Sequence, residues 1–432
     1  MEGGLQAFES SSVALIDSLP MPQSYDGVGG GSYRILMVAP QPFFRERGTP
    51  FSVLHRIRAL LRLGHRVELL TYPFGERVEL PGLVVHRSPR PPGVRDVAIG
   101  PSVAKAALDV PLFARAARLI ARDDYDLVHT HEEAGAVGSW ARRHRGLPHL
   151  YDMHSSLPEQ LHNFGRYDRF PFPWLMGAVE EYILAGSDAV VAISPSLAER
   201  VEALGFAGPV EVIENVLDFP SRARVPEHRR DDPRREAAWP EVTDGANERD
   251  PYRLLYTGSL EPYQGLELLI GALSFVDGRG RPVVALVVGG TEDPRRRLED
   301  HAREARVADL VHFLPPVAPA AVKGLHQRAD VLVSLRSSGT NPPLKLYEYL
   351  RAGKPILATD VPSHRQVLDP VFAELVAPEA DAVAAGIARL RDRPERARRL
   401  ASEARSVAER RYGPETYMRR LARIVDRVVA GR

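Results

Sequence analysis

The sequence predicts an α/β protein in which two doubly wound, Rossmann-like domains face a cleft. Strand-like and helix-like runs alternate over two long segments, and a charged stretch with few apolar residues separates these segments. The length of 432 residues, about three times that of a usual single domain, agrees with two domains. Ligands of such sheets bind beyond the carboxyl ends of the strands, so both domains can contribute to one site.

The first domain is predicted to span residues 33–218. A polar segment, residues 1–32, precedes it and is expected to be a disordered extension. The apolar run 35–38 is the first strand, and residues 52–63 form a helix with apolar residues on one face. Further strands of this domain are expected at 67–70, 127–129, 149–151, 189–193 and 210–213.

A dense run of Arg, Asp and Glu marks residues 219–251 as a linker. The alternation resumes in a second domain, residues 252–410, which contains a helix at 266–273. Its strands are expected at 254–256, within 282–288, and at 311–313, 331–335 and 356–359. Residues 411–432 are the last segment, and its amphipathic helix is expected at 414–429, with Met418, Leu421, Ile424, Val425 and Val428 as apolar positions.

Composition excludes several classes of protein. The chain has no cysteine, which excludes disulfides, thiolate metal sites and cysteine nucleophiles, and no apolar run approaches the ~18 residues of a membrane span. The N-terminus lacks the features of a secretion signal, so we expect a cytoplasmic protein.

The net charge is +1, yet residues 33–122 hold fifteen Lys and Arg against six Asp and Glu. This excess is either a solvated surface or a face for anionic lipid or an anionic acceptor. Nucleic acid is disfavoured as a partner, because no binding motif accompanies the charge.

The segment 337–355, SSGTNPPLKLYEYLRAGKP, has the features of a nucleotide site. A polar, glycine-containing loop follows the predicted strand 331–335, and a helix begins near Pro343. The free N–H groups at a helix N-terminus attract phosphate. Glu348, a turn or so inside the helix, is a natural acceptor for the hydroxyls of a ribose. The segment therefore predicts a pocket for a phosphorylated sugar nucleotide.

Seven pieces of sequence, taken in order, resemble the family-4 retaining glycosyltransferases of GT-B fold. YRILMVAP resembles the opening strand of that family, HTHEE and YDMHSS its two histidine-bearing strand ends, and YTGSLEPYQGLELLI its donor-phosphate loop. AISPSLAERV and IENVLD resemble segments near the domain junction. ADVLVSLRSSGTNPPLKLYEYLRAGKPILATD resembles the donor-binding signature, and the resemblance as a whole runs from about residue 34 to residue 423.

The resemblance implies a retaining, metal-independent transfer of a sugar from a nucleoside-diphosphate sugar to a glycan or lipid-linked acceptor, in polysaccharide or glycolipid biosynthesis. The nucleotide-sugar is then a substrate, and no cofactor is expected. The C-terminal helix is expected to cross back onto the first domain. Two alternatives stay open: another GT-B enzyme of sugar nucleotides, such as an epimerase or hydrolase, and a binding protein without turnover.

Donor-binding roles follow from the same resemblance. Glu348 matches the second glutamate of the family's Glu-x7-Glu motif, which binds the donor ribose. Thr340 stands where the first glutamate would be, and Thr340 or Asn341 could hydrogen-bond the sugar or the phosphate instead. Leu344 and Lys345 lie in the first helical turn, where backbone N–H groups can meet phosphate.

A basic pair that the family places after a strand-end glycine, here Gly258, is missing. Ser259 and Gln264 stand at the matching positions, although the charge of a departing diphosphate must be offset in the transition state. The nearest cations, judged from their places at strand ends, are Lys345, Arg336 and Arg47. We expect Lys345 to be the catalytic substitute and Arg47 to assist donor binding.

The acceptor side is predicted on the first domain. His154 matches a family histidine that approaches the donor sugar or the acceptor hydroxyl, and an imidazole suits either proton transfer or positioning. His131 and Glu132 lie at the same sheet edge. His129 and His131 share one face of their strand, so a metal site is conceivable, although the family typically lacks a catalytic metal. Gly48 lets a phosphate or a sugar approach the backbone.

Residues 162–176, HNFGRYDRFPFPWLM, interleave aromatic and basic side chains. They form either a packed connection or a lip that faces lipid or acceptor. The second interpretation adds peripheral contact with an anionic membrane, at its cytoplasmic face.

Overall fold

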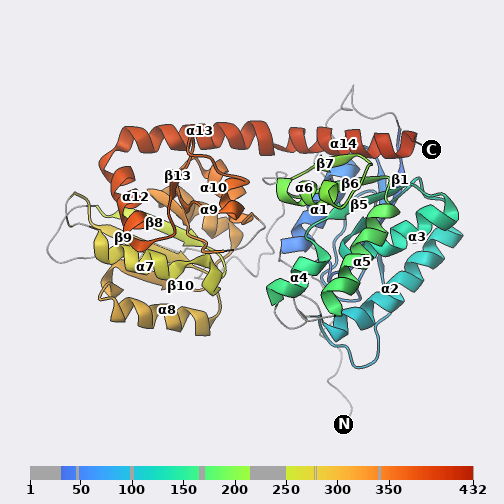
Figure 1. The fold of residues 1–432 in the computed structure, drawn as a ribbon, viewed down its shortest axis with the longest axis horizontal. Coiled ribbons are helices and arrows are strands. Elements are labelled where there is room, and N and C mark those ends of the chain that lie inside the picture. Colours follow the sequence, from blue (N-terminus) through green and yellow to red (C-terminus); the bar gives the residue numbers. More distant parts are fainter. Residues whose placement is uncertain are drawn as a thin grey trace, which may run out of the picture. The chain divides into compact units, whose positions relative to one another are not determined.

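The computed structural model describes residues 31–44, 48–97, 102–164, 171–214, 250–276, 278, 280–338 and 342–431. The chain divides into two compact units (Figure 1). The first domain comprises Met1–Arg230 together with Pro414–Arg432, and the second domain comprises Asp231–Gly413. Apart from two residues of each, the predicted extension 1–32 and the predicted linker 219–251 lie outside the described residues.

The first domain contains a parallel seven-stranded sheet in the order β3-β2-β1-β4-β5-β6-β7. Its central strands are buried on both faces, and this burial is visible in the sequence as a continuous apolar run in β1 and β6. The edge strand β3 is only half-buried, and the sequence does not predict it. The strands are β1 (Arg34–Ala39), β2 (Arg66–Thr71), β3 (Leu83–Arg87), β4 (Leu127–His131), β5 (His149–Met153), β6 (Ala189–Ala192) and β7 (Val210–Val212).

Helices cover both faces of this sheet. One face packs on α1 (Gly48–Arg62) and α14 (Pro414–Ala430). The other packs on α2 (Val103–Arg122) and α3 (Gly135–Arg145). The remaining helices of this domain are α4 (Leu157–Phe164), α5 (Phe172–Ala185) and α6 (Pro195–Ala203), which pack beside β5 and β6.

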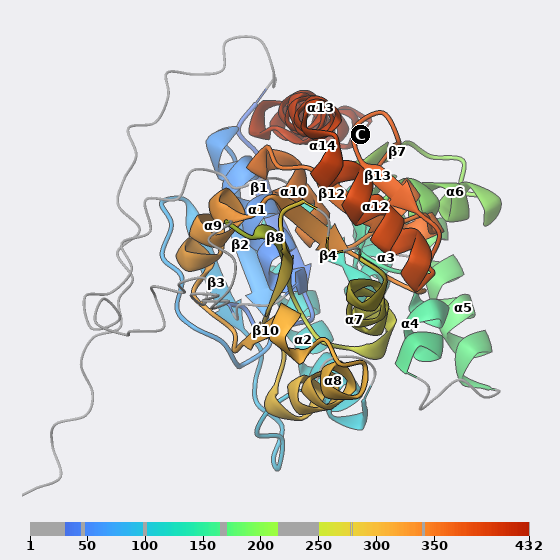
Figure 2. The same ribbon diagram turned by 90° about the vertical axis from the view of Figure 1, so that its left-hand side faces the viewer.

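The second domain contains a parallel six-stranded sheet in the order β10-β9-β8-β11-β12-β13. Its strands are β8 (Tyr252–Thr257), β9 (Val283–Val288), β10 (Val311–Leu314), β11 (Val331–Ser334), β12 (Ile356–Thr359) and β13 (Glu374–Val376). Its helices are α7 (Leu266–Phe275), α8 (Glu292–Glu304), α9 (Pro319–Arg328), α10 (Lys345–Ala352), α11 (Pro362–Arg365), α12 (Ala380–Asp392) and α13 (Pro394–Tyr412). Figure 2 shows α7 and α8 on one side of this sheet and α9 and α10 on the other.

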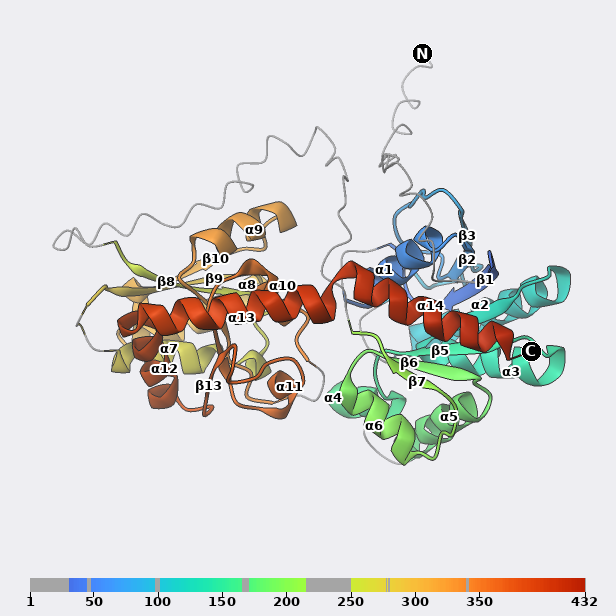
Figure 3. The same cartoon turned by 90° about the horizontal axis from the view of Figure 1, so that it is seen from above.

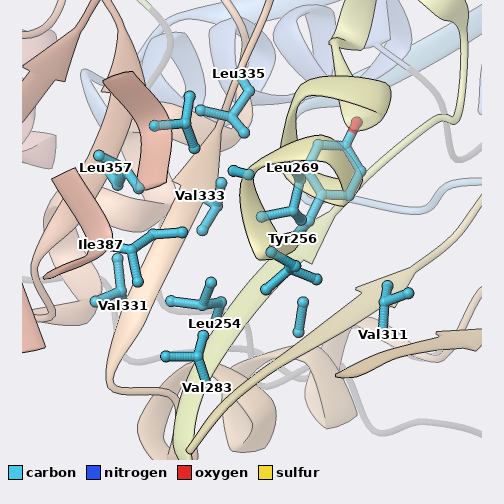
Figure 4. Packing of buried hydrophobic residues seen from close by; sticks show 14 of the residues in the cluster. Leu254, Tyr256, Leu269, Val283, Val311, Val331, Val333, Leu335, Leu357 and Ile387 are labelled. Atoms are coloured by element: carbon cyan, nitrogen blue, oxygen red, sulfur yellow. The ribbon is translucent and has the colours of Figure 1, made fainter. Parts of the chain in front are cut away.

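The core of the second domain forms where β8, β9 and β11 meet α7 and α12. Figure 4 shows Leu254, Tyr256 and Val333 of the strands facing Leu269 and Ile387 of the helices. Burial of these side chains fixes the strands, and with them the loops at their carboxyl ends, where a ligand of such a sheet binds.

The C-terminal helix α14 packs in the first domain although it follows the second domain in sequence. Figure 3 shows α14 lying across the strands of the first domain, and it contacts α1 and β5. Its five predicted apolar positions are all buried there. The predicted α/β fold with two doubly wound sheets and a C-terminal helix that crosses back is confirmed.

Among the described residues, no helix combines the length and the apolar character that a membrane span requires.

Candidate active site

The strand ends of the second domain approach one another closely at Gly258, which follows β8. Gly258 has φ 143°, and its N–H donates to the Val288 carbonyl of β9 at 3.0 Å. A Cβ atom at Gly289 would lie 2.1 Å from the Gly258 carbonyl oxygen. Only glycine fits this approach, and the backbone there stays open to a ligand.

Lys345 begins α10 and extends to the loop after β8. Its Nζ atom donates to Gln264 Oε1 at 3.3 Å and lies 3.7 Å from the centre of the Tyr256 ring. Gln264 Nε2 donates in turn to Ser259 Oγ at 3.1 Å. The structure therefore brings Gly258, Ser259, Gln264 and Lys345 together, with the lysine beside the positions where a basic pair was expected.

The side chain of Lys345 is partly buried, so its ammonium form is poorly solvated there. Burial, and then the nearby Arg336 guanidinium, lower the pKa of Lys345 well below its usual value. Burial also lowers the pKa of Arg336, whose guanidinium carbon stands 5.3 Å from the centre of the Tyr263 ring. No carboxylate of the described residues pairs with Lys345. An anion that entered this place would relieve the repulsion between the two cations.

Glu348 lies one turn after Lys345 on α10 and is exposed. The buried side of the helix fixes this orientation: the hydroxyl of Tyr349 accepts the N–H of Thr257 at 3.1 Å, and Leu346 is fully buried. Leu344, directly before α10, is 43% exposed. Thr340 and Asn341 lie outside the described residues.

A hollow of about 460 Å³ opens next to this group, beyond the carboxyl ends of three neighbouring strands. It is lined by the loops after β8, β9 and β10, among them Gly258, Ser259, Gly290, Thr291, Pro316 and Val317. Apolar side chains, among them Leu260 and Val288, make up most of this lining, and Ser259 and Thr291 add polar groups, as in many pockets for small molecules.

In the first domain, three histidines gather around one aspartate at the carboxyl ends of β4 and β5. His129 Nε2 lies 3.2 Å from Asp152 Oδ2. His131 Nδ1 lies 2.9 Å from His154 Nε2, and these two atoms lie 3.8 and 3.6 Å from oxygens of Asp152. The structure thus joins the two predicted residues His131 and His154 in a buried pair, which we call the histidine pair.

The charge of Asp152 determines which neighbouring nitrogen atoms donate hydrogen bonds to it. Burial would raise the pKa of Asp152, but the Arg56 guanidinium and the neighbouring imidazoles hold it well below its usual range. An ionised carboxylate only accepts, so His129 donates its Nε2–H to Asp152. Burial lowers the pKa of both His129 and His131, which keeps these imidazoles neutral. The hydrogen bond between His131 Nδ1 and His154 Nε2 contains one proton, and either ring nitrogen can be its donor, depending on the tautomers.

The atoms of His129, His131 and Asp152 lie within 4.8 Å of one another, a spacing that a metal ion could bridge. However, Arg56 Nε and Nη2 already bind both oxygens of Asp152, at 2.7 and 3.2 Å. A buried guanidinium repels a divalent cation at this distance. The residues fit a hydrogen-bonded network better than a metal site.

Glu132 follows β4 directly and has φ 51°, an uncommon conformation for a residue with a side chain. Lys105 Nζ of α2 binds Glu132 Oε2 at 3.2 Å and Glu133 Oε1 at 2.7 Å. Burial raises the pKa of Glu133 to about 7 and that of Asp109 to about 6, whereas Lys105 lowers the pKa of Glu132 against the effect of burial.

The positions predicted at the start of α1 are only partly described. Gly48 begins α1, and Arg47 lies outside the described residues.

The sequence does not single out Arg56 or Lys105, which the structure places among the buried charges of the first domain. One signal was available for Lys105, because the chain contains only four lysines among its many arginines.

Two family models match the chain. The model described as "Glycosyltransferase Family 4" matches residues 47–219, in the first domain. The model described as "Glycosyl transferases group 1" matches residues 241–407, in the second domain.

Curated relatives extend over much of the chain. The D-inositol 3-phosphate glycosyltransferase of Thermomonospora curvata is 30% identical over 296 residues, which are 65% of this chain and 66% of the relative. The phosphatidyl-myo-inositol mannosyltransferase of Mycobacterium leprae is 26% identical over 402 residues, which are 91% of this chain and 97% of the relative.

Solved structures share the fold. Sucrose-phosphate synthase of Thermosynechococcus elongatus has a TM-score of 0.72 at 19% identity, over 93% of this chain and all of that chain. HepE of Anabaena, solved in complex with UDP, has a TM-score of 0.66 at 17% identity, over 91% of this chain and all of that chain.

Proposed function

Because the chain belongs to the family-4 glycosyltransferases of GT-B fold, we propose that it transfers a sugar from a nucleoside-diphosphate sugar to a hydroxyl group of a glycan or lipid-linked acceptor, with retention and without a metal ion. One observation carries the donor part of this proposal: Lys345 is a desolvated ammonium without a carboxylate partner among the described residues, next to the strand-end glycine Gly258.

Lys345 offsets the charge of the departing diphosphate. Cleavage of the sugar–phosphate bond leaves negative charge on the diphosphate, and a fixed cation in a desolvated place stabilises that charge more than the ground state. The positive end of α10 adds to this effect, since Lys345 begins that helix. These groups supply the positive charge that a metal ion would otherwise provide.

Glu348 binds the ribose of the donor. It lies one helical turn beyond Lys345 and is exposed, so its carboxylate can accept hydrogen bonds from two adjacent hydroxyls while the diphosphate meets Lys345. HepE, which shares the fold, was solved with UDP, and uridine nucleotides are therefore the first probes to use.

The histidine pair, His131 and His154, serves the acceptor side. A buried imidazole pair that shares one proton can accept a hydrogen bond from a hydroxyl group or donate one to it without a change in net charge. The matched relatives carry names that refer to inositol derivatives, which are polyols. We propose a polyol or glycan acceptor, free or linked to lipid.

The proposal extends to peripheral contact with the cytoplasmic face of a membrane. Phe172, Trp174 and Leu175, at the start of α5, are 46%, 68% and 46% exposed, and aromatic side chains of this kind favour the interface of a bilayer. Co-sedimentation with vesicles that contain anionic lipid tests this, at low and at high salt. Trp174→Ser with Leu175→Ser should reduce binding, and Phe275→Ser, a 64% exposed residue of the second domain, is the control. Equal binding by both variants would refute the contact.

The donor proposal is tested by thermal shift with nucleoside diphosphates and sugar nucleotides, followed by product analysis. We expect a nucleoside diphosphate to raise the melting temperature of the wild type, and turnover of the sugar nucleotide to require an acceptor. Stabilisation by no nucleotide would refute the donor site. Turnover without any acceptor would instead identify a hydrolase or an epimerase, and binding without turnover a sugar-nucleotide-binding protein.

A further inference from the structure

A line of buried contacts connects the histidine pair to the C-terminal helix. The guanidinium carbon of Arg56, on α1, stands 5.0 Å from the centre of the Tyr417 ring, on α14. Arg56 binds Asp152 on β5 through two nitrogen atoms. Asp152 in turn lies within 3.6 Å of His154 Nε2. The line therefore runs from Tyr417 through Arg56 and Asp152 to the histidine pair, and all of its members are buried.

The geometry points to Tyr417 and Arg56 as positioning residues: the Tyr417 ring holds the Arg56 guanidinium against Asp152, and Asp152 thereby fixes the arrangement of the histidine pair. The positioning of the histidine pair does not depend on the proposed function. Only the use of this pair on the acceptor side rests on it.

The ring of Tyr417 matters because Arg56 lacks other support on one side. Its Nη1 atom is buried and has no hydrogen-bond partner among the described residues. A cation that is buried in this way depends on the aromatic face that covers it. Burial raises the pKa of Tyr417 to about 12, so the ring stays a neutral phenol and does not form an ion pair with Arg56.

Arg56 matters because Asp152 is surrounded by imidazoles. With Arg56 in place, the guanidinium compensates the carboxylate. Burial lowers the pKa of His131, and the neighbouring imidazoles and Arg56 add to this effect against Asp152, which raises it. Without Arg56, Asp152 would be a buried anion that draws a proton onto a neighbouring ring. His129 of β4, Asp152 of β5 and Arg56 of α1 face the histidine pair, and Glu132 lies close enough to interact with His154.

Imidazole NMR tests this inference without any substrate. Protein labelled with 13C at histidine is titrated, and the signals of His131 and His154 are assigned with His131→Gln and His154→Gln. Loss of the adjacent charge in Arg56→Met should raise the titration midpoint of the pair by about one pH unit or more. Tyr417→Leu should raise it by a smaller amount, because Arg56 is still present but no longer held by an aromatic face.

Two control variants make the result specific. Tyr417→Phe keeps the ring and should titrate as the wild type. Leu421→Ala removes a fully buried side chain one turn further along α14, so it should lower the melting temperature without moving the midpoints. If Tyr417→Leu does not fold, Tyr417→Met, which fills the space without an aromatic face, takes its place.

The inference is wrong if the variant without the ring titrates as the wild type while its melting temperature falls as in Leu421→Ala. Tyr417 would then be an ordinary part of the core. Unchanged midpoints in Arg56→Met would overturn the role of Arg56 in the same way. Neither outcome depends on transferase activity, so a failure here is distinct from a failure of the proposed function.

Discussion

The ammonium of Lys345 lies 3.7 Å from the centre of the Tyr256 ring and 3.3 Å from the amide oxygen of Gln264. Both partners are neutral, so the charge of this lysine is solvated by a π face and one amide dipole. A partly buried cation with such partners is poorly stabilised unless an anion joins it. Under the proposed function, Lys345 takes the place of the basic pair, whose positions are occupied here by Ser259 and Gln264.

Lys345→Met is expected to abolish most of the transferase turnover while the fold is kept. Loss of one preorganised group that stabilises developing negative charge reduces kcat by about 100-fold. Removal of a partly buried and poorly compensated charge should be neutral or stabilising for the fold. Steady-state kinetics with a UDP-sugar and thermal melting check the two expectations. Lys323→Met, an exposed lysine of the same domain, is the control and should match the wild type. Full activity of Lys345→Met would contradict the role of Lys345.

The stability of the nucleotide-free protein should depend on pH through Lys345. Its pKa is lowered in the folded state, so between that value and the pKa of about 10.4 in the unfolded state the unfolded chain binds more protons. The contribution of Lys345 to the free energy of unfolding therefore rises with pH in this window. Urea midpoints of the wild type and Lys345→Met should converge as the pH approaches about 10. A constant difference would show that Lys345 titrates normally.

Glu348→Gln should weaken binding of UDP by about tenfold and leave binding of pyrophosphate unchanged. The substitution keeps the shape of the side chain but removes the charge that strengthens hydrogen bonds to the ribose hydroxyls. Titration calorimetry with both ligands separates ribose binding from phosphate binding. Glu267→Gln, at an exposed glutamate in the first turn of α7, is the matched control. An equal loss for UDP and pyrophosphate would argue for a general electrostatic effect instead.

Gly289→Ala should destabilise the protein and reduce nucleotide affinity together. The new Cβ atom would lie 2.1 Å from the Gly258 carbonyl oxygen, and the backbone has φ 125°, so we expect a cost of at least about 1–3 kcal/mol. Gly324→Ala, in the middle of α9, provides the contrast. Its new Cβ atom would meet nothing within 4 Å, so this substitution should stabilise the protein by about 0.5–1 kcal/mol. Chemical denaturation of both variants measures the difference. A Gly289→Ala protein as stable as the wild type would contradict the tight approach of the strands.

Most of the fold could be predicted because its central strands are buried on both faces. The run 356–359 matches β12 (Ile356–Thr359), and the run 35–38 lies inside β1. The strand β3 (Leu83–Arg87) could not be predicted, because an edge strand needs no continuous apolar run. The helix expected near Pro343 begins at Lys345, within the usual uncertainty of helix ends.

The placement of the candidate residues of the second domain could be predicted in outline for a related reason. Gly258 and Lys345 follow or begin elements whose order is visible in the sequence, and the carboxyl ends of parallel strands meet at one edge. The contacts of Arg56 could not be predicted, because a helix and a strand 96 positions apart meet only through tertiary packing. Nothing in the local sequence distinguishes the buried Arg56 from Arg58 and Arg62 of the same helix, which are only half-buried.

The place of α14 in the first domain has a consequence for synthesis on the ribosome. Domains generally fold from the N-terminus as the chain emerges, at about 5–20 residues per second. Leu421, Ile424 and Val425 nevertheless complete the first-domain core, and they are translated only after Asp231–Gly413. The apolar face of β1 and α1 in the nascent first domain therefore stays uncovered while the second domain is synthesised. Chaperones that hold nascent chains have a defined target in that interval.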